Sequence, residues 1–545
     1  MGKLVWLLVD GLPYDLVARF SAQLPTLASA LREGRTRRLR PAFPNCQTPP
    51  SLASLFTGEQ PAETGLTGYF IPRVHADDPL GFDDAFLLGV ASRCRFLWEI
   101  AAGAGASVRL LHVPFVDAAS LGTSLRLYCY GFVRPALSPA IHTLKAGEPM
   151  PFDSGCETAW HALWQHDSDV VLLRCADGRE HLLSTSKQIE RVQLSADLVT
   201  ELCQVEINGT RALIVLGIWR PHVQGDARQV EDYRHHMRGT PFFGSTFSRA
   251  YRAGALGKTL HDGGDGAAEC LFVHCLERLA KRYAEDCLFA AQVAEMDCNS
   301  LVLAYQPVMD LALHELLGFA SEGCAYATDA ARAVVEPLLC RLLTGVDTLL
   351  AELLRMTGPD TDVLLSADHG MLPIDTLLYP NVLLREYGWL VLTEASGIDP
   401  ERSACFYHPS ENGLLVFNRE TMRKQGITAE QIADRLLAGI AQACGRPAAL
   451  LECAIVDSGE RWMAYHYLRP PACIQAKAEA HGAEVLALSR KTGDHCVQSD
   501  ASALEGFIAD LRGRVLPQQT RLQTWEVGRY AQRRFAKEET DALVE

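Results

Sequence analysis

Side chains that could bind a metal ion follow several apolar runs of this sequence, and one pair is the clearest. The run 362–365 is followed, after two small residues, by Asp368 and His369, and Gly370 lets the chain turn away. A carboxylate and an imidazole at the carboxyl end of a buried strand are two of the donors that a divalent metal needs. A solvated turn can have the same sequence, so the pair gains weight only if other segments supply further donors.

Another carboxylate follows the first apolar run of the chain. Residues 3–9 have the continuous apolar pattern of a strand buried on both faces, and Asp10 and Gly11 come directly after them. Ligands of open α/β sheets gather at this end of the strands. Asp10 is therefore a candidate ligand, but it could equally cap a helix that begins just after it.

A possible nucleophile stands at the start of a predicted helix. Thr48 occupies an N-cap position, prolines fill the first turn, an apolar stretch follows, and Gly58 ends the helix. The hydroxyl could be a cap and nothing more. It could also attack a phosphate, because a helix N-terminus presents free amides to that anion and a nearby divalent metal can hold the oxygen as an alkoxide.

Two further donors follow the strand predicted over residues 300–305. If the next segment is helical, Asp310 and His314 are one turn apart and point the same way, as two ligands of one ion must. A plain amphipathic helix would also place a polar pair at that spacing. Both interpretations stay open at this point.

The last candidate is a histidine near the end of the chain. The apolar run 484–488 predicts another strand of the core, and His495 follows it. His481 competes for the same role. We favour His495 because it comes after the apolar run and His481 comes before it.

Composition limits the classes of protein to consider. The 545 residues are 48% hydrophobic and 21% charged, which is typical of a large α/β domain with insertions. The net charge of −15 argues against nucleic-acid polymers and anionic membranes as partners, but a small anionic substrate is compatible if bound metal reverses the local field. The 17 scattered cysteines without a CxxC pair, and a first apolar run too short for a signal peptide, predict a cytoplasmic protein.

Changes in periodicity divide the chain into a core and two insertions. Short β patterns over 170–174 and 181–184, and over 202–207 and 211–218, predict two hairpins in a β-rich cap. The second of these contains the turn signal Asn208-Gly209. The expected parts are core residues 1–150, the β-rich cap 151–262, core residues 263–375, an α+β insertion over 376–480, core residues 481–520 and a polar helical tail over 521–545.

In this order the motifs resemble the alkaline phosphatase superfamily, in the branch of type I phosphodiesterases and nucleotide pyrophosphatases. The matching segments are Val9-Asp10-Gly11, Thr48 to Gly58, Tyr305 through Pro307 and Asp310 to His314, Ser366 to Met371, and Gly493 to His495. The resemblance implies an α/β/α sandwich with a mostly parallel central sheet. It also implies hydrolysis of small phosphoric esters.

The resemblance assigns a role to each matching residue. One metal ion would be held by Asp310, His314 and His495, and the other by Asp10, Asp368, His369 and the oxygen of Thr48. Thr48 would attack in line and form a phospho-threonine intermediate, which water then releases. Nitrogen and oxygen donors without a thiolate suit two zinc ions, and manganese is compatible with the same set.

One departure from the family pattern bears on the substrate. Tyr69 stands where the diesterase branch usually has an asparagine that donates to a phosphoryl oxygen. A phenol can donate as well, so Tyr69 is a candidate substrate contact, and a phosphomonoesterase or a phosphonate C–P hydrolase is an alternative function. A catalytically silent binding scaffold is an alternative of another class, against which the complete set of ligands argues. The oligomeric state stays open.

Overall fold

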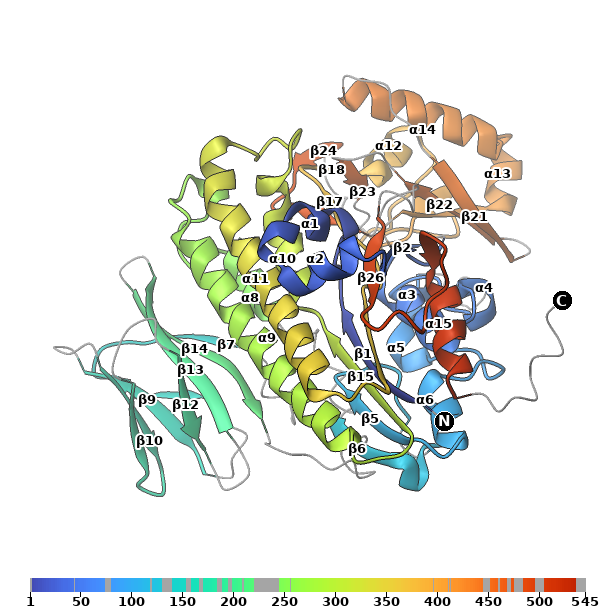
Figure 1. Ribbon diagram of the computed structural model, residues 1–545. Coiled ribbons are helices and arrows are strands. Elements are labelled where there is room, and N and C mark those ends of the chain that lie inside the picture. The colour runs from blue at the N-terminus through green and yellow to red at the C-terminus, as the bar shows by residue number, and fades with distance from the viewer. Residues whose placement is uncertain are drawn as a thin grey trace.

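A computed structural model gives the arrangement of the chain (Figure 1). It describes residues 2–43, 45–73, 80–117, 120–129, 140–152, 158–165, 170–183, 189–194, 199–207, 210–219, 245–254, 256–395, 397–409, 411, 413–444, 451–458, 461–467, 472–474, 484–495 and 504–535.

A mainly parallel sheet forms the centre of the molecule. In spatial order its strands are β27 (Arg521–Gln523), β2 (Thr36–Arg40), β26 (Gly506–Asp510), β16 (Thr361–Ser366), β1 (Lys3–Val9), β15 (Ser300–Gln306), β5 (Ser107–Leu111) and β6 (Leu125–Cys129). Strand β1 pairs in parallel with both β15 and β16, whereas β26 runs antiparallel to β16 and to β2. The expected α/β fold with a mostly parallel central sheet is thereby confirmed.

Helices cover both faces of this sheet, which explains why its middle strands are mostly apolar and buried along their whole length. Strands β15 and β16 are buried at every residue. In Figure 1 one face carries α2, α9 and α11, and the other carries α3, α6 and α15. Their bounds are α2 (Pro25–Arg32), α9 (Ala267–Ala294), α11 (Asp329–Met356), α3 (Thr48–Thr57), α6 (Leu97–Gly103) and α15 (Thr524–Arg533).

Helix α15, which lies in the tail predicted from the sequence, holds the end of α3. The Arg529 Nε donates to the Gly58 carbonyl at 2.9 Å, and the Gln532 Nε2 donates to the Thr57 carbonyl at 2.7 Å. These two carbonyls lie at the C-terminus of α3, where a helix has acceptors without intrahelical partners. The tail therefore completes the helix that begins at Thr48.

The β-rich segment forms two antiparallel sheets with a hydrophobic core of their own, and Figure 1 shows them projecting from the main body. Both predicted hairpins are confirmed, since β10 pairs with β11 and β13 pairs with β14. The Asn208-Gly209 turn lies outside the described residues. The strands are β7 (Ala140–Thr143), β8 (Met150–Phe152), β9 (Trp160–Trp164), β10 (Val171–Cys175), β11 (Glu180–Leu183), β12 (Ile189–Gln193), β13 (Val199–Ile207) and β14 (Thr210–Trp219).

The second inserted segment has another separate core, which includes Phe406, Val416 and Leu436. Its antiparallel sheet has the order β19-β20-β22-β21 and lies beside α12, α13 and α14 in Figure 1. The bounds are β19 (Cys405–Tyr407), β20 (Leu414–Asn418), β21 (Leu451–Ser458), β22 (Arg461–Tyr467), α12 (Pro380–Glu386), α13 (Arg419–Gln425) and α14 (Ala429–Cys444).

The prediction of a core strand over 484–488 is wrong. Strand β24 (Leu486–Leu488) joins β18 (Thr376–Leu378) and β23 (Ala472–Ile474) in a small separate sheet, and Leu488 is 72% exposed. The chain returns to the central sheet only at β26, whose residues are all buried. A short apolar run shows that a strand is favourable but not which sheet it joins. Within the described residues, the helices include none that is long and apolar enough to cross a membrane.

Candidate metal centre

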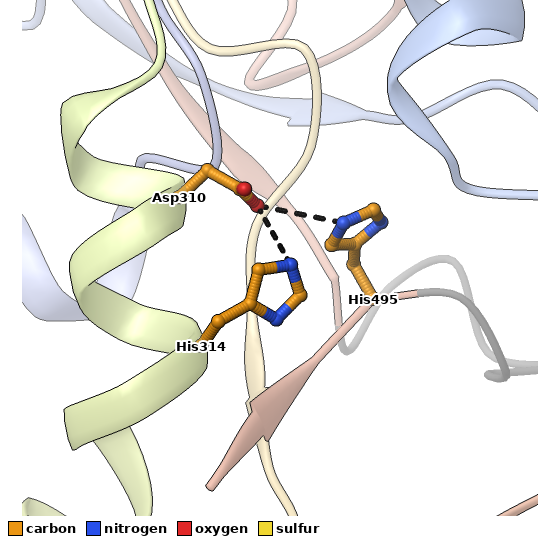
Figure 2. Close-up of side chains that lie close together, drawn as sticks. All are labelled: Asp310, His314 and His495. Atoms are coloured by element: carbon orange, nitrogen blue, oxygen red, sulfur yellow. Dashed lines mark ion pairs between the residues drawn. The ribbon is translucent and has the colours of Figure 1, made fainter. Parts of the chain in front are cut away.

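Three of the predicted ligands meet at one carboxylate oxygen. Asp310 and His314 lie on α10 (Val308–Leu316), and Figure 2 shows His495 facing them from the segment after β25 (Gly493–Asp494). The Asp310 Oδ1 lies 3.3 Å from the His314 Nε2 and 3.4 Å from the His495 Nε2. The segment is helical, so residues four positions apart point the same way. We call these three residues the first triad.

A second triad lies at the carboxyl ends of β1 and β16. The His369 Nε2 lies 3.3 Å from the Asp10 Oδ1 and 3.3 Å from the Asp368 Oδ2. Strands β1 and β16 are neighbours that run in parallel, so the residues that follow them emerge at the same edge of the sheet. Asp10, Asp368 and His369 are all buried.

The two triads are in direct contact. The Asp310 N–H donates to the Asp10 carbonyl at 3.0 Å, and the His369 and His495 rings stack with centroids 3.8 Å apart. Gly11 makes this approach possible, because its φ is +68° and a Cβ there would lie 2.9 Å from the Asp310 Cα. The six side chains therefore form one continuous cluster.

The imidazoles of both triads share one orientation. Each Nδ1 faces a backbone carbonyl, with His314 at 2.7 Å from the Gly493 oxygen, His369 at 3.0 Å from the Gly370 oxygen and His495 at 3.2 Å from the Cys46 oxygen. A carbonyl can only accept, so the hydrogen-bond pattern places the ring proton on Nδ1 and leaves a lone pair on Nε2. That lone pair faces a carboxylate oxygen, which is also an acceptor. A cation between the two atoms removes this conflict.

The carboxylates give a second reason to place cations here. Among the described residues, the Asp10 Oδ1, the Asp310 Oδ1 and the Asp368 Oδ2 are buried and accept no hydrogen bond. A buried carboxylate oxygen without a donor is costly, and such groups usually pair or coordinate a metal. Two clusters of nitrogen and oxygen donors, each with its atoms within 4.8 Å of one another, fit divalent cations such as zinc.

Burial shifts the titration of both kinds of ligand. It raises the pKa of Asp10 and of Asp310 well above the ordinary value, and raises the pKa of Asp368 to about 7. It lowers the pKa of His314 to about 3. The cause is the same in each case, because a buried site disfavours whichever form is charged. The imidazole of His314 is therefore neutral and ready to bind metal at neutral pH. At Asp368, in contrast, a metal ion must compete with a proton for the carboxylate.

Thr48 lies beside the second triad. Its Oγ1 is 3.2 Å from the His369 Nε2. The prediction that Thr48 is an N-cap is wrong by one position, because α3 begins at Thr48 and Gln47 is the N-cap. Gln47 has the extended backbone angles of an N-cap residue. The Thr48 hydroxyl is therefore not a helix cap, and it faces His369 instead.

The start of α3 offers few amides to an anion. Pro49 and Pro50 have no N–H, and the Ser51 N–H donates to the Gln47 carbonyl at 3.2 Å. Of the first four residues of the helix, this leaves the Thr48 N–H as the amide without a helical hydrogen bond. The sequence-based expectation that this helix N-terminus presents free amides therefore applies to the Thr48 N–H among these four residues.

Two tyrosines border the site. Tyr305, at the end of β15, donates its hydroxyl hydrogen to the Asp10 Oδ2, and burial raises its pKa so that it stays a donor. Sequence reasoning gave it no role in the site, although a phenol near the end of an apolar strand was a possible signal. Tyr69 is partly buried, and its backbone N–H donates to the Gln47 Oε1 at 2.6 Å. His481 lies outside the described residues.

Comparison with known proteins gives one family match. Residues 4–137 match the model of the type I phosphodiesterase / nucleotide pyrophosphatase family. This stretch contains Asp10 and Thr48, and the match confirms the resemblance that the motifs indicated. A search of curated proteins finds no matching relative.

Solved structures with low sequence identity align over most of the chain. Phosphonoacetate hydrolase from Sinorhizobium meliloti 1021, in complex with phosphonoformate, is 14% identical with a TM-score of 0.44, covering 98% of this chain and 96% of that one. An inactive variant of murine ectonucleotide pyrophosphatase / phosphodiesterase 5, in complex with AMP, is 10% identical with a TM-score of 0.41, covering 98% and 95%. A variant of alkaline phosphatase PafA is 10% identical with a TM-score of 0.39, covering 97% and 94%.

Proposed function

We propose that this chain, whose residues 4–137 match the type I phosphodiesterase / nucleotide pyrophosphatase family, hydrolyses phosphoric diesters or pyrophosphates with two divalent metal ions. One observation carries the proposal. In each of the two triads an imidazole Nε2 faces a carboxylate oxygen, acceptor against acceptor, and the Thr48 hydroxyl lies 3.2 Å from the His369 Nε2. A divalent cation bound in each triad satisfies the nitrogen and oxygen acceptors together.

The ligands divide between two metal positions in this proposal. Bound zinc, or manganese as an alternative, would offset negative charge on the phosphoryl oxygens and favour ionisation of the attacking hydroxyl. One position is held by Asp310, His314 and His495, and the other by Asp10, Asp368, His369 and the Thr48 oxygen. Hydrogen bonds orient these ligands. Backbone carbonyls accept from the Nδ1 atoms of the three histidines, and the Tyr305 hydroxyl donates to Asp10.

Thr48 is the nucleophile in this proposal. Its Oγ1 attacks the phosphorus, and the bond to the leaving group breaks on the opposite side. The Thr48 N–H, which lies at the start of α3, can donate to a phosphoryl oxygen during this step. Water then cleaves the phospho-threonine ester and restores the hydroxyl. The Tyr69 hydroxyl is a candidate donor to another phosphoryl oxygen.

A panel of substrates tests the proposal. Purified protein is freed of metal, supplied with zinc or manganese, and assayed with bis-p-nitrophenyl phosphate, p-nitrophenyl phosphate, a nucleoside diphosphate ester and phosphonoacetate. We expect turnover of the diester or the pyrophosphate, about two metal ions per chain by elemental analysis, and loss of activity with a chelator. A preference for the monoester or phosphonoacetate would favour the alternative functions. A protein that binds no zinc and turns over no substrate would contradict the proposal.

A further inference from the structure

One acidic side chain of the second inserted segment lies outside the metal centre but contacts the segments around Thr48. Glu411 lies between β19 and β20, and its side chain is buried with an exposed fraction of 1%. It is not part of either triad. Its side chain accepts hydrogen bonds from Asn45, Gln47 and Phe70, although Glu411 itself belongs to a segment with a separate hydrophobic core.

Both carboxylate oxygens of Glu411 accept hydrogen bonds from the segments on either side of α3. The Oε1 accepts from the Gln47 Nε2 at 2.6 Å and from the Asn45 Nδ2 at 3.1 Å. The Oε2 accepts from the Phe70 N–H at 3.2 Å. Gln47 extends this network, because its Oε1 accepts from the Tyr69 N–H at 2.6 Å. A single carboxylate thus joins the residues just before Thr48 to the segment that contains Tyr69.

The backbone leaves little room at this junction. A Cβ at Gly68 would lie 2.5 Å from the Glu411 Oε2 and 3.2 Å from the Asn45 Nδ2. A side chain at residue 68 would therefore displace the carboxylate from its present contacts with Asn45, Gln47 and Phe70. Hydrogen bonds to a carboxylate are shorter and stronger than those between neutral groups, and in a buried site they hold their partners in one geometry.

We infer that Glu411 is a positioning residue that sets the geometry of the Thr48 nucleophile and of Tyr69. This inference deepens the proposed function and rests on it. Gln47 is the N-cap of α3 and the residue directly before Thr48, and its carbonyl accepts from the Ser51 N–H, so we expect loss of the bond that holds its side chain to let the start of the helix shift. A displacement of about 1 Å at an attacking atom lowers turnover by roughly 100-fold. The second inserted segment therefore acts on catalysis through this one side chain.

Substitution of Glu411 tests the inference. We expect Glu411→Ala to lower kcat by about 100-fold with a smaller change in KM, while metal content stays near that of the wild type. Glu411→Gln keeps an acceptor for Asn45 and Gln47 but turns an amide N–H₂ toward the Phe70 N–H, so it should restore part of the loss. Glu420→Gln is the matched control, because Glu420 lies in the same segment, is exposed and pairs with Lys424 at 2.6 Å.

A double-mutant cycle separates positioning from general destabilisation. If Glu411 acts through Gln47, the variant Gln47→Ala/Glu411→Ala should lose no more kcat than the worse single variant. Losses that multiply, or losses that follow the folded fraction measured by circular dichroism, would overturn the inference. So would kcat values of folded Glu411 variants within about twofold of the wild type. Wild-type protein that turns over none of the four substrates would instead refute the proposed function, so the two failures are distinguishable.

Discussion

The rings of His369 and His495 stack, with centroids 3.8 Å apart and planes inclined by 18°. His369 follows β16, whereas His495 follows β25, which pairs with β17 (Leu372–Pro373) just beyond Met371. Each ring presents its Nε2 to a different triad. A ligand of one candidate metal position therefore packs directly on a ligand of the other. We expect a change at one position to affect the other through this contact.

Replacement of His495 should lower metal content by about one ion per chain. His495→Ala removes one donor of the first triad and the ring that packs on His369, so binding at the second triad should also weaken. Elemental analysis after dialysis measures both effects. His181→Ala is the control, because His181 pairs with Glu190 at 3.0 Å in the β-rich segment. If His481→Ala lowers metal content and His495→Ala does not, the assignment of the last ligand is wrong.

Removal of the Thr48 hydroxyl should abolish turnover while the fold and the metal content persist. We expect Thr48→Ala to lower kcat by at least about 1,000-fold, because the Thr48 hydroxyl is the group of α3 that lies beside the His369 Nε2. Thr57→Ala is a matched control in the same helix, since the Thr57 hydroxyl donates to the Ala53 carbonyl at 2.7 Å. Near-normal rates for Thr48→Ala would mean that water attacks the substrate directly.

Two glycines with the same backbone conformation should differ in their response to a side chain. Gly11 and Gly34 have φ values of +68° and +66°, so the backbone conformation alone should make alanine cost about 1–2 kcal/mol of unfolding free energy at either position. A Cβ at residue 34 meets nothing within 4 Å, whereas at residue 11 it lies 2.9 Å from the Asp310 Cα. Only Gly11→Ala should therefore lower metal affinity. Equal affinities for the two variants would contradict the close contact between β1 and α10.

Metal affinity should rise as the pH increases through about 7. Because burial raises the pKa of Asp368 to about 7, this carboxyl is protonated below that pH, and a cation must displace the proton. The pKa of His314, lowered to about 3, keeps its imidazole neutral over the same range. Apparent zinc affinity should fall by at least about tenfold per pH unit below 7, because burial also raises the pKa of Asp10 in the same triad. Competition with a chromophoric chelator measures this, and an affinity independent of pH between about 6 and 8 would contradict it.

The parts of the site that depend on local sequence could be predicted. The apolar runs before Asp10 and before Asp368 had to be buried strands, and parallel strands end at a common edge. The spacing of Asp310 and His314 determined that their side chains share one face once the segment is helical. These inferences need only the neighbours of each residue in the chain.

The parts that depend on distant neighbours could not be predicted. Strand β24 pairs with β18 and not with the central sheet, and no property of the run 484–488 distinguishes the two. His495 reaches the first triad because β25 pairs with β17, a two-residue contact without a sequence signal. Glu411 is similar to other acidic residues of its segment in sequence, and only its burial against Asn45 and Gln47 distinguishes it.

The contact of α15 with the end of α3 has a consequence for synthesis. A ribosome releases the segment that carries Thr48 hundreds of residues before Arg529 and Gln532, whose side chains bond to the Gly58 and Thr57 carbonyls. Strand β2 likewise has its partners in the sheet only after β26 and β27 have been synthesised. The nascent chain must therefore keep the helix that begins at Thr48 incompletely anchored until β26, β27 and α15 have been synthesised, and we expect a chaperone that shields this exposed edge to raise the yield of folded protein.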